Sequence, residues 1–327
     1  MTSSSLPTIS IIMPVLNRND TLEKAILSVL SQEYKRIEFI ILDGGSTDGS
    51  VDIIKRYAAH LTYWHSQSDG GPTVAMNMGI EKATGDIIAI LMADDWYAPS
   101  TLQKIADAYL SYPEADMFTC GGCIERYDAS SQRYQRVRTF NTARSLFLSF
   151  YTICFAASAI CCRFIKKSFY QQIGVYQPFD ANGKIFLSND KEFLLRAVIH
   201  HAKDVFVDYT GHHYLAHSAS STFSRHRGNT LKMCEEHMAT AQYYFSSPRL
   251  TLSQRACLKY WYYDQATRIV LYRLLDRQFS SARLVFQRQC SQSHVVWLFF
   301  FSFTAATIVV KKMVRAVKSI FIKAYNG

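Results

Sequence analysis

Carboxylate and amide side chains follow four consecutive predicted strands, each at the point where the strand ends. These are Asn17, Asp43, Asp69, and the pair Asp94 and Asp95. In a parallel sheet the carboxyl ends of the strands share one rim, where ligands bind. Asp and Asn are also common turn residues, and this alternative explains a single position such as Asp48 better than the whole row. A carboxylate pair at a strand end suits Mg²⁺ or Mn²⁺, which prefer oxygen ligands.

The elements that position these residues alternate between strand and helix. Short apolar runs predict strands over 9–15, 37–42, 61–64 and 87–92, and helical patterns occupy 20–30, 51–57, 72–83 and 100–112. Continuous apolar strands, each followed by a helix, are typical of a mostly parallel sheet covered on both faces. We therefore predict an α/β fold.

The rest of the chain is more mixed. Residues 145–162 carry no charge, which admits a membrane span, although polar residues within the segment favour a helix followed by a buried strand. Residues 190–199 are predicted to be helical, as is a polar and aromatic region over 225–276.

The positive charge is concentrated at the end of the chain. The formal net charge is +10, and eight Lys or Arg residues follow Asp276, the last acidic residue. The remainder is nearly neutral (28 basic against 26 acidic residues), which argues against a nucleic-acid-binding protein. The apolar run 295–310 is shorter than the roughly 20 residues of a spanning helix. With the basic, amphipathic segment 311–324, it predicts a tail inserted shallowly into an anionic membrane surface, or alternatively a packed terminal helix.

The eight cysteines are scattered, and no secretory signal opens the sequence. This pattern is typical of a reduced, cytosolic-facing protein rather than a disulfide scaffold. Cys120 and Cys123 form a CxxC pair, but no second pair completes a four-sulfur zinc site. We expect ordinary free thiols.

Six short segments, taken in order and spacing, resemble the family 2 glycosyltransferases, which are nucleotide-sugar enzymes with the GT-A fold. They are IIMPVLN (11–17), EFIILDGGSTDG (38–49), SDGG (68–71), AMNMG (75–79), ATGD (83–86) and LMADD (91–95). A fainter match continues through 173–174 to 189–196. The resemblance covers about two thirds of the sequence and does not extend beyond about residue 230.

The resemblance implies roles for the residues at the rim of the sheet. Asp95 would bind Mg²⁺ or Mn²⁺, and Asp94 would contact the ribose or a metal-bound water. Asp43 would accept hydrogen bonds from the base or ribose, Asp69 would reach the base, and Pro14 and Asn17 would shape the nucleotide slot. Asn77, in the AMNMG segment, is a further candidate for substrate binding. Because Asp95 ends an apolar strand, we expect its carboxylate to have little structural role.

An inverting transfer needs one carboxylate to take the proton of the acceptor hydroxyl. Asp190 is at the matching position and begins a predicted helix, so it is our candidate base, with Glu192 as the alternative. Asp190 could instead simply cap its helix, as Asp often does.

The sequence departs from many relatives in the segment 153–158. A His or Gln is common there, whereas Ser158 is the only polar residue of this segment, so acceptor contacts there are in doubt. Further metal or diphosphate contacts could come from a later group of residues, namely His212, His213, His217, His226 and Arg225.

These observations predict a metal-dependent, inverting glycosyltransferase that moves a sugar from a nucleoside diphosphate, with UDP as the expected carrier, to a glycan or lipid-linked acceptor. The alternatives are a nucleotidyltransferase and a catalytically inactive membrane-bound scaffold of the same fold. We expect a GT-A domain over 1–225 (nucleotide-sugar half 8–115, acceptor half 116–225), a helical extension over 226–288, and a membrane-associating tail over 289–327. The expected location is the cytoplasmic face of the inner (plasma) membrane.

Overall fold

The structure is a computed structural model that describes residues 6–140, 146, 148–156, 158–180, 182–217 and 227–292. The chain divides into two compact units, residues 1–224 and 225–327. The predicted segments 295–310 and 311–324 lie outside the described residues.

The first half of unit 1 is a parallel sheet. Strands β1 (Ile9–Val15), β2 (Ile37–Asp43), β3 (Tyr63–Ser66) and β4 (Ile87–Ile90) pair in the order β3-β2-β1-β4, and every pair is parallel. Most of their residues are buried apolar side chains, as expected for strands covered on both faces. The prediction of a mostly parallel α/β sheet is confirmed, with the third strand two residues later than expected.

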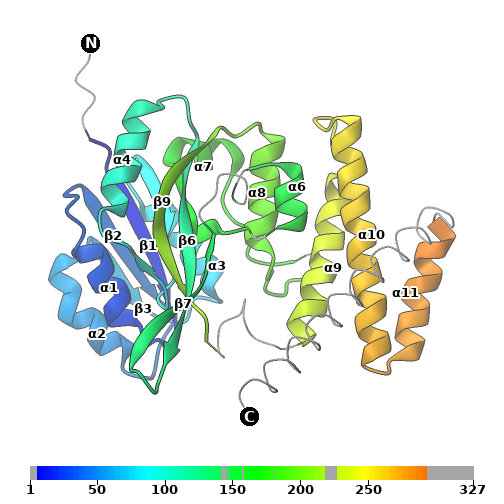
Figure 1. Ribbon diagram of the computed structural model, residues 1–327, viewed down its shortest axis with the longest axis horizontal. Coiled ribbons are helices and arrows are strands. Elements are labelled where there is room, and N and C mark those ends of the chain that lie inside the picture. The colour runs from blue at the N-terminus through cyan, green and yellow to red at the C-terminus, as the bar shows by residue number, and fades with distance from the viewer. Residues whose placement is uncertain are drawn as a thin grey trace. The chain divides into compact units, whose positions relative to one another are not determined.

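Helices cover both faces of this sheet (Figure 1). One face packs on α1 (Leu22–Leu30), α2 (Ser50–Tyr57) and α4 (Thr101–Ser111) in a single apolar core. The other face packs on α3 (Pro72–Lys82), which approaches β1 closely because Gly79 has no side chain. A Cβ at Gly79 would lie 2.4 Å from Cγ2 of Ile12.

The second half of unit 1 extends the same sheet with mixed pairing. Strand β8 (Arg163–Lys166) is antiparallel to both β4 and β6 (Met117–Asp128), and β6 is parallel to β9 (Asp204–Leu215). Two further strands complete the sheet: β5 (Trp96–Tyr97) beside β9, and β7 (Arg133–Phe140), which forms a hairpin with β6.

The uncharged segment 145–162 contains α6 (Phe150–Phe155) and the short η2 (Ile160–Cys162), and the buried strand β8 begins directly after it. The interpretation as a helix followed by a buried strand is therefore confirmed over the described residues, with the strand one residue later than the segment. No helix in the described part of the chain is both long and apolar enough to cross a membrane. Two more helices, α7 (Lys167–Ile173) and α8 (Asn189–Ile199), complete unit 1.

Unit 2 is helical, as predicted. It contains α9 (Arg227–Tyr244), α10 (Leu252–Leu275) and α11 (Phe279–Gln292). Trp261 of α10 is fully buried and its ring lies 5.0 Å from that of His237 of α9, while Val270 and Ala282 join α10 to α11. These contacts make α10 the central helix of the unit.

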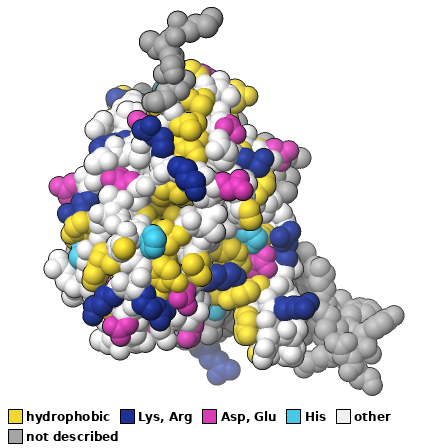
Figure 2. Space-filling model, turned by 90° about the vertical axis from the view of Figure 1, so that its left-hand side faces the viewer, with side chains coloured by type: hydrophobic (Ala, Val, Ile, Leu, Met, Phe, Trp, Pro, Cys, Tyr) yellow, Lys and Arg dark blue, Asp and Glu magenta, His cyan; other side chains and the backbone are white. Residues whose placement is uncertain are grey.

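Figure 2 shows the side of the molecule that lies at the left in Figure 1, where α1 and α2 are exposed. Lys and Arg side chains are interspersed there with Asp and Glu. The mixture of both signs of charge on this face is consistent with the nearly equal numbers of basic and acidic residues up to Asp276.

Candidate active site

The loops after β1 and β2 are joined through Asn17. Its backbone has a left-handed conformation (φ 51°), which Asn tolerates better than most residues. Its backbone N–H donates to Oγ of Ser46 (2.7 Å), and its side-chain Oδ1 accepts from the N–H of Thr47 (2.9 Å). Pro14 is buried within β1 beside Leu42 of β2. Both residues therefore shape the edge of the sheet where a ligand is expected.

Asp43 is fully buried, and its carboxylate accepts hydrogen bonds from its own loop. The donors are the N–H groups of Gly45 (3.1 Å) and Ser46 (2.9 Å), the Ser66 hydroxyl (2.6 Å) and the Ser46 hydroxyl. The backbone N–H groups of the Gly-Gly-Ser turn point back at the strand end, so the carboxylate stabilises the turn. The expected contact of Asp43 with a base or ribose stays a prediction.

Asp69 lies against the loop after β2. A Cβ at Gly44 would be 3.3 Å from both carboxylate oxygens of Asp69, so the absent side chain allows the two loops to meet. Oδ1 of Asp69 accepts from the N–H of Gly71 (2.8 Å), and the residue is half-buried. The structure thus brings Asp69 to the same edge as Asp43.

Asn77 of α3 makes two hydrogen bonds to the backbone of a residue distant in sequence, and its expected contact with substrate stays a prediction. Its Nδ2 donates to the carbonyl of Tyr176 (2.7 Å), and its Oδ1 accepts from the N–H of Tyr176 (3.0 Å). The side-chain amide therefore pairs with the backbone as a second peptide group would. Asn77 fixes the connection 174–188, which leads into α8.

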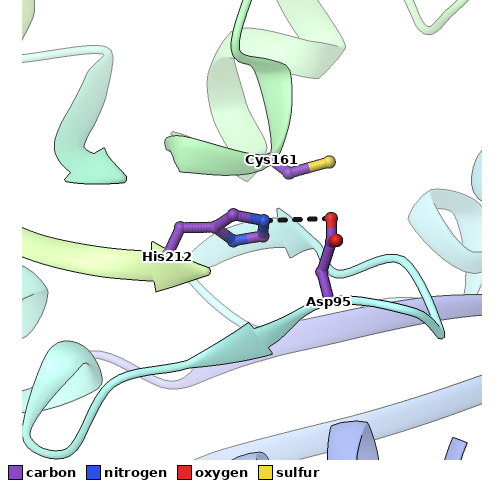
Figure 3. Close-up of side chains that lie close together, drawn as sticks. All are labelled: Asp95, Cys161 and His212. Carbon is purple, nitrogen blue, oxygen red and sulfur yellow. Dashed lines mark hydrogen bonds and ion pairs between the residues drawn. The ribbon is translucent and has the colours of Figure 1, made fainter. Parts of the chain in front are cut away.

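Asp95 is buried and hydrogen-bonded on both carboxylate oxygens. Oδ2 lies 3.1 Å from Nε2 of His212 on β9, and Oδ1 accepts from the N–H of Leu215 (3.0 Å). Figure 3 shows Asp95 and His212 facing each other beside Cys161. Burial raises the pKa of Asp95, while His212 opposes that shift. The expectation that this carboxylate has little structural role is wrong, because it joins the end of β4 to β9.

Asp94 is the more accessible carboxylate of the pair, with a side chain 15% exposed against 5% for Asp95. Its Oδ2 lies 2.8 Å from Nε2 of His217 and 3.6 Å from Nε of Arg18. Arg18 is a site residue that the sequence analysis missed. Its position directly after Asn17, at the end of the first strand, was the available signal.

The residues present fit a divalent metal ion. Two adjacent carboxylates, each beside a histidine nitrogen, supply oxygen and imidazole donors of the kind that Mn²⁺ accepts. The carboxylate oxygen of Asp95, Sγ of Cys161 and a ring nitrogen of His212 all lie within 4.8 Å of one another. The buried Nδ1 of His212 has no hydrogen-bond partner within the part of the chain that the structure describes.

Asp190 is the second residue of α8, and Ser188 occupies the N-cap position. The alternative that Asp190 is the helix cap is therefore wrong. Oδ1 of Asp190 accepts from the N–H of Lys191 (2.7 Å), and the Ser158 hydroxyl also hydrogen-bonds to the carboxylate. Burial raises the pKa of Asp190, and the charge of Lys191 is the largest opposing effect.

Glu192 forms a two-point ion pair within α8. Its oxygens lie 3.1 and 2.9 Å from Nε and Nη2 of Arg196. Arg196 in turn donates to the carbonyls of Ile173 (2.6 Å) and Val175 (2.8 Å). Glu192 therefore helps to hold the connection after α7, which favours Asp190 over Glu192 as a base.

The charges of three carboxylates act on Cys161, and of these Asp95 lies within 4.8 Å of its Sγ. Burial is the main cause that raises the pKa of this thiol, and the negative charges of Asp95, Asp190 and Asp94 raise it further, in that order. The end of β4 and the start of α8 thus meet around one buried side chain. Asp94, Asp95 and Asp190, which are distant in the sequence, form one acidic site.

The remaining candidates separate into three groups. His212 and His217 are part of this site, whereas His213 lies on the other face of β9, where its Nδ1 is 3.0 Å from Glu125 and 3.2 Å from Sγ of Cys123. Arg225 and His226 lie outside the described residues. Cys120 and Cys123 form no disulfide among the described residues, and Cys120 packs in the main core. Cys123 lies within 4.8 Å of Glu125 and His213, so the expectation of ordinary thiols without metal stays a prediction.

Comparison with known proteins gives one consistent match. Residues 10–170 match the family described as Glycosyl transferase family 2. An uncharacterized glycosyltransferase of Haemophilus influenzae is 43% identical over 103 residues, 31% of this chain and 41% of that protein. The chain spans about two fifths of the length of the first curated relatives that it matches.

Solved structures share the fold. The mannosyltransferase PcManGT from Pyrobaculum calidifontis, in complex with GDP-Man and Mn²⁺, has a TM-score of 0.57 at 13% identity, over 94% of this chain and 81% of that chain. S. aureus TarS 1-349, in complex with UDP-GlcNAc, has a TM-score of 0.52 at 14% identity, over 81% of both chains. The predicted GT-A fold is confirmed.

Proposed function

The chain belongs to glycosyl transferase family 2, and on that premise we propose that it transfers a sugar from a nucleoside diphosphate donor to an acceptor hydroxyl, with inversion at the anomeric carbon. The observation that carries this proposal is the convergence of Asp94, Asp95 and Asp190 around Cys161 at one edge of the sheet. One site then offers carboxylates for a cation and a separate carboxylate for a proton.

On the donor side, Asp94 and Asp95 hold the divalent ion. When bound, Mn²⁺ or Mg²⁺ neutralises charge that develops on the departing diphosphate. Accessibility supports Asp94 with His217 as the groups that meet the ion first, and His212 holds Asp95 in place behind them. Arg18 adds a guanidinium beside Asp94, where it can bind a phosphate oxygen.

The nucleotide occupies the loops after β1, β2 and β3. Pro14, Asn17 and Asp43 shape this slot, and Asp69 is the carboxylate placed to reach the base. Neighbours of the same fold bind UDP-GlcNAc and GDP-Man, which supports a nucleotide sugar as the donor class. We propose a UDP-sugar for this chain.

On the acceptor side, Asp190 takes the proton of the attacking hydroxyl. Its raised pKa makes it a stronger base than an exposed Asp, and the Ser158 hydroxyl orients it. The acceptor is a glycan or lipid-linked saccharide. We further propose that the basic tail brings the protein to the inner face of an anionic membrane, where such acceptors would be used.

Two alternatives are less well supported. A nucleotidyltransferase normally has a Gly-rich loop with a basic residue after its first strand, where this chain has Pro14-Val15-Leu16-Asn17. An inactive scaffold of the same fold would have no need for a metal-binding carboxylate pair together with the half-buried Asp190.

Release of UDP from UDP-sugars tests the proposal without knowledge of the acceptor. Transferases slowly hydrolyse their donor, so a panel of UDP- and GDP-sugars with and without Mn²⁺ should include one that is hydrolysed only with metal. Stabilisation of the protein by UDP with Mn²⁺ should accompany that activity. If no nucleotide sugar is hydrolysed and no nucleoside diphosphate raises the melting temperature, the transferase proposal is wrong.

A further inference from the structure

The hairpin formed by β6 and β7 is a local basic feature in a nearly neutral unit. It carries four arginines and two acidic residues between positions 125 and 140. Three of these arginines, Arg126, Arg133 and Arg138, are exposed, and we call them the arginine strip. They have no acidic partner among the described residues, since both acids of the hairpin are engaged elsewhere.

The engagement of the two acids is specific. Glu125 is buried beside His213 (3.0 Å) and Arg136 (3.6 Å). Asp128 accepts from the hydroxyls of Ser130 and Ser131 and from Nε2 of Gln135, which shapes the turn of the hairpin. These donors are neutral, so Asp128 keeps its negative charge, and the strand register places it opposite Arg133. With four arginines against Glu125 and Asp128, the hairpin still carries a net charge of +2.

Strand register places the arginine strip on the same face of the sheet as the candidate active site. Gly122 and Ile124 of β6 pair with His212 and Tyr214 of β9, so Arg126, two residues farther along β6, continues that face. A bulge in β7 leaves Val137 unpaired, with Arg138 opposite Ile124 and Gln135 opposite Arg126. Arg133 and Arg138 are five positions apart, an odd offset that would put them on opposite faces of a regular strand, and the bulge brings them to one face.

The opposite face of the hairpin contacts the rest of unit 1 through Tyr134, which stays partly exposed. Nζ of Lys24 lies between the rings of Trp96 and Tyr134, 3.1 and 3.3 Å from their centroids. Burial lowers the pKa of Lys24 to about 8. Trp96 also stacks on His213 at 5.3 Å, with 18° between the ring planes. These contacts hold the hairpin firmly while its other face stays open.

We propose that the arginine strip binds an anionic glycan, so that the acceptor of this transferase carries carboxylate or phosphate groups. The inference rests on the proposed function, because the bound glycan is an acceptor only if this chain is a sugar transferase. The strip begins beside Tyr214, which contacts His212 at 4.3 Å, and continues away from Asp95 along β6. A chain whose terminal hydroxyl reaches Asp190 can extend along these arginines, which offer paired donors to its anions.

The test compares two full-length variants that each lose three positive charges. Arg126→Gln/Arg133→Gln/Arg138→Gln removes the strip, and Lys35→Gln/Lys55→Gln/Lys203→Gln removes three exposed lysines elsewhere on unit 1. Binding of fluorescent polygalacturonate is measured by anisotropy, with neutral dextran of matched length as reference. The strip variant should bind polygalacturonate about ten-fold more weakly, because each exposed charge pair contributes a factor of a few. The lysine variant should bind like the unmodified protein.

Several results would overturn the proposal. Equal loss in both variants would mean that only overall charge matters, and equal binding of dextran would mean that anions are not recognised. A strip variant that binds polygalacturonate normally but phosphatidylglycerol vesicles weakly would assign the strip to a membrane surface. Loss of stabilisation by UDP with Mn²⁺ would assign it to the donor. Donor hydrolysis by the unmodified chain is measured in the same buffer, so failure of the transferase proposal is recognised separately.

Discussion

At the scale of single residues, neighbouring carboxylates have different environments. Asp95 accepts two hydrogen bonds in the interior, whereas Asp94 faces His217 and Arg18 at the surface. Asp190 is a third case, because it is a half-buried carboxylate that accepts hydrogen bonds from the N–H of Lys191 and from the Ser158 hydroxyl. On these differences we base the proposed roles: Asp94 in metal binding, Asp95 in metal binding and in positioning the end of β4, and Asp190 in proton transfer.

We expect Asp94→Asn to lower the affinity for Mn²⁺ in the presence of UDP at least ten-fold, with little change in the melting temperature of the protein alone.

We expect Asp95→Ala to weaken Mn²⁺ binding as well. In addition, it should lower the free energy of unfolding of the protein alone by about 1–3 kcal/mol, because the N–H of Leu215 loses its buried acceptor. Thermal-shift titrations with Mn²⁺ measure both effects. An Asp95 variant with unchanged stability and unchanged metal response would exclude this assignment.

We expect Asp190→Asn to reduce sugar transfer by about 10²–10⁴-fold, the usual effect of losing a general base, while UDP with Mn²⁺ still binds. The variant should be at least as stable as the unmodified protein at neutral pH. Because burial raises the pKa of Asp190, the charged form is less favourable in the folded state, and stability falls as pH rises through that raised value. Asn cannot be charged, so the variant avoids the cost of a buried charge. Glu192→Gln is the comparison. Full activity of Asp190→Asn together with loss of activity in Glu192→Gln would assign the role of base to Glu192.

The same raised pKa predicts the pH dependence of transfer. A base acts only when deprotonated, so transfer should decline, as pH falls, at a higher pH than the ordinary Asp value of 3.8 would give. Binding of UDP with Mn²⁺, followed by thermal shift over the same range, reports on Asp94 and Asp95. Parallel loss of binding and transfer would mean that the donor site, not Asp190, limits the reaction.

At the scale of elements, connections rather than helices and strands determine the geometry of the site. The connection 174–188 carries the chain from α7 to Asp190, and it is held by Asn77 from α3 and by Arg196 from α8. The contact of Asn77 crosses 99 residues of sequence. These hydrogen bonds give the Asn of the AMNMG segment a structural role in holding the connection.

We therefore expect Asn77→Ala to destabilise the protein by about 1–3 kcal/mol, because the backbone N–H and carbonyl of Tyr176 lose their partner. Transfer should fall more than binding of UDP with Mn²⁺, since the connection positions Asp190. Urea unfolding and the two activity readouts measure this. Glu81→Ala, an exposed change on the same helix, is the matched control. If Asn77→Ala instead abolishes nucleotide binding and leaves stability intact, a direct substrate contact is the better interpretation.

At the scale of the whole molecule, charge is distributed unevenly. Eight basic residues and no acidic residue follow Asp276, and the apolar run 295–310 lies among them. Basic residues near an anionic surface contribute about 1 kcal/mol each, and apolar side chains add their burial. This combination is expected to bind membranes without spanning them.

We expect full-length protein to sediment with phosphatidylglycerol vesicles, and a chain that ends at Gln292 to remain in solution. That truncation keeps α11, whose Ala282 packs on Val270 of α10. High salt should weaken vesicle binding only in part, because salt does not screen apolar insertion. If high salt releases the full-length protein from vesicles completely, the contact is electrostatic only and the tail does not insert. If both chains sediment equally, the membrane contact lies outside the residues after Gln292.

Local patterns in the sequence determined the strands, most helices and the residues of the sheet edge. Apolar runs and turn residues act over a few positions, so β1, β2 and α3 begin within a residue of their predicted starts. The same patterns identified Asp94, Asp95 and Asp190 as the residues with chemistry. They also identified the change from a nearly neutral body to a basic tail.

Tertiary structure alone decided which hydrogen-bond partners these residues have. Asp43 and Asn77 are used by the backbone, and His212 and His217 reach Asp95 and Asp94 across more than a hundred residues of sequence. The arginine strip depends on the bulge at Val137, which changes the side of the strand on which Arg133 lies relative to Arg138. Hydrogen-bond partners and strand register are properties of segments distant in sequence, so no local pattern specifies them.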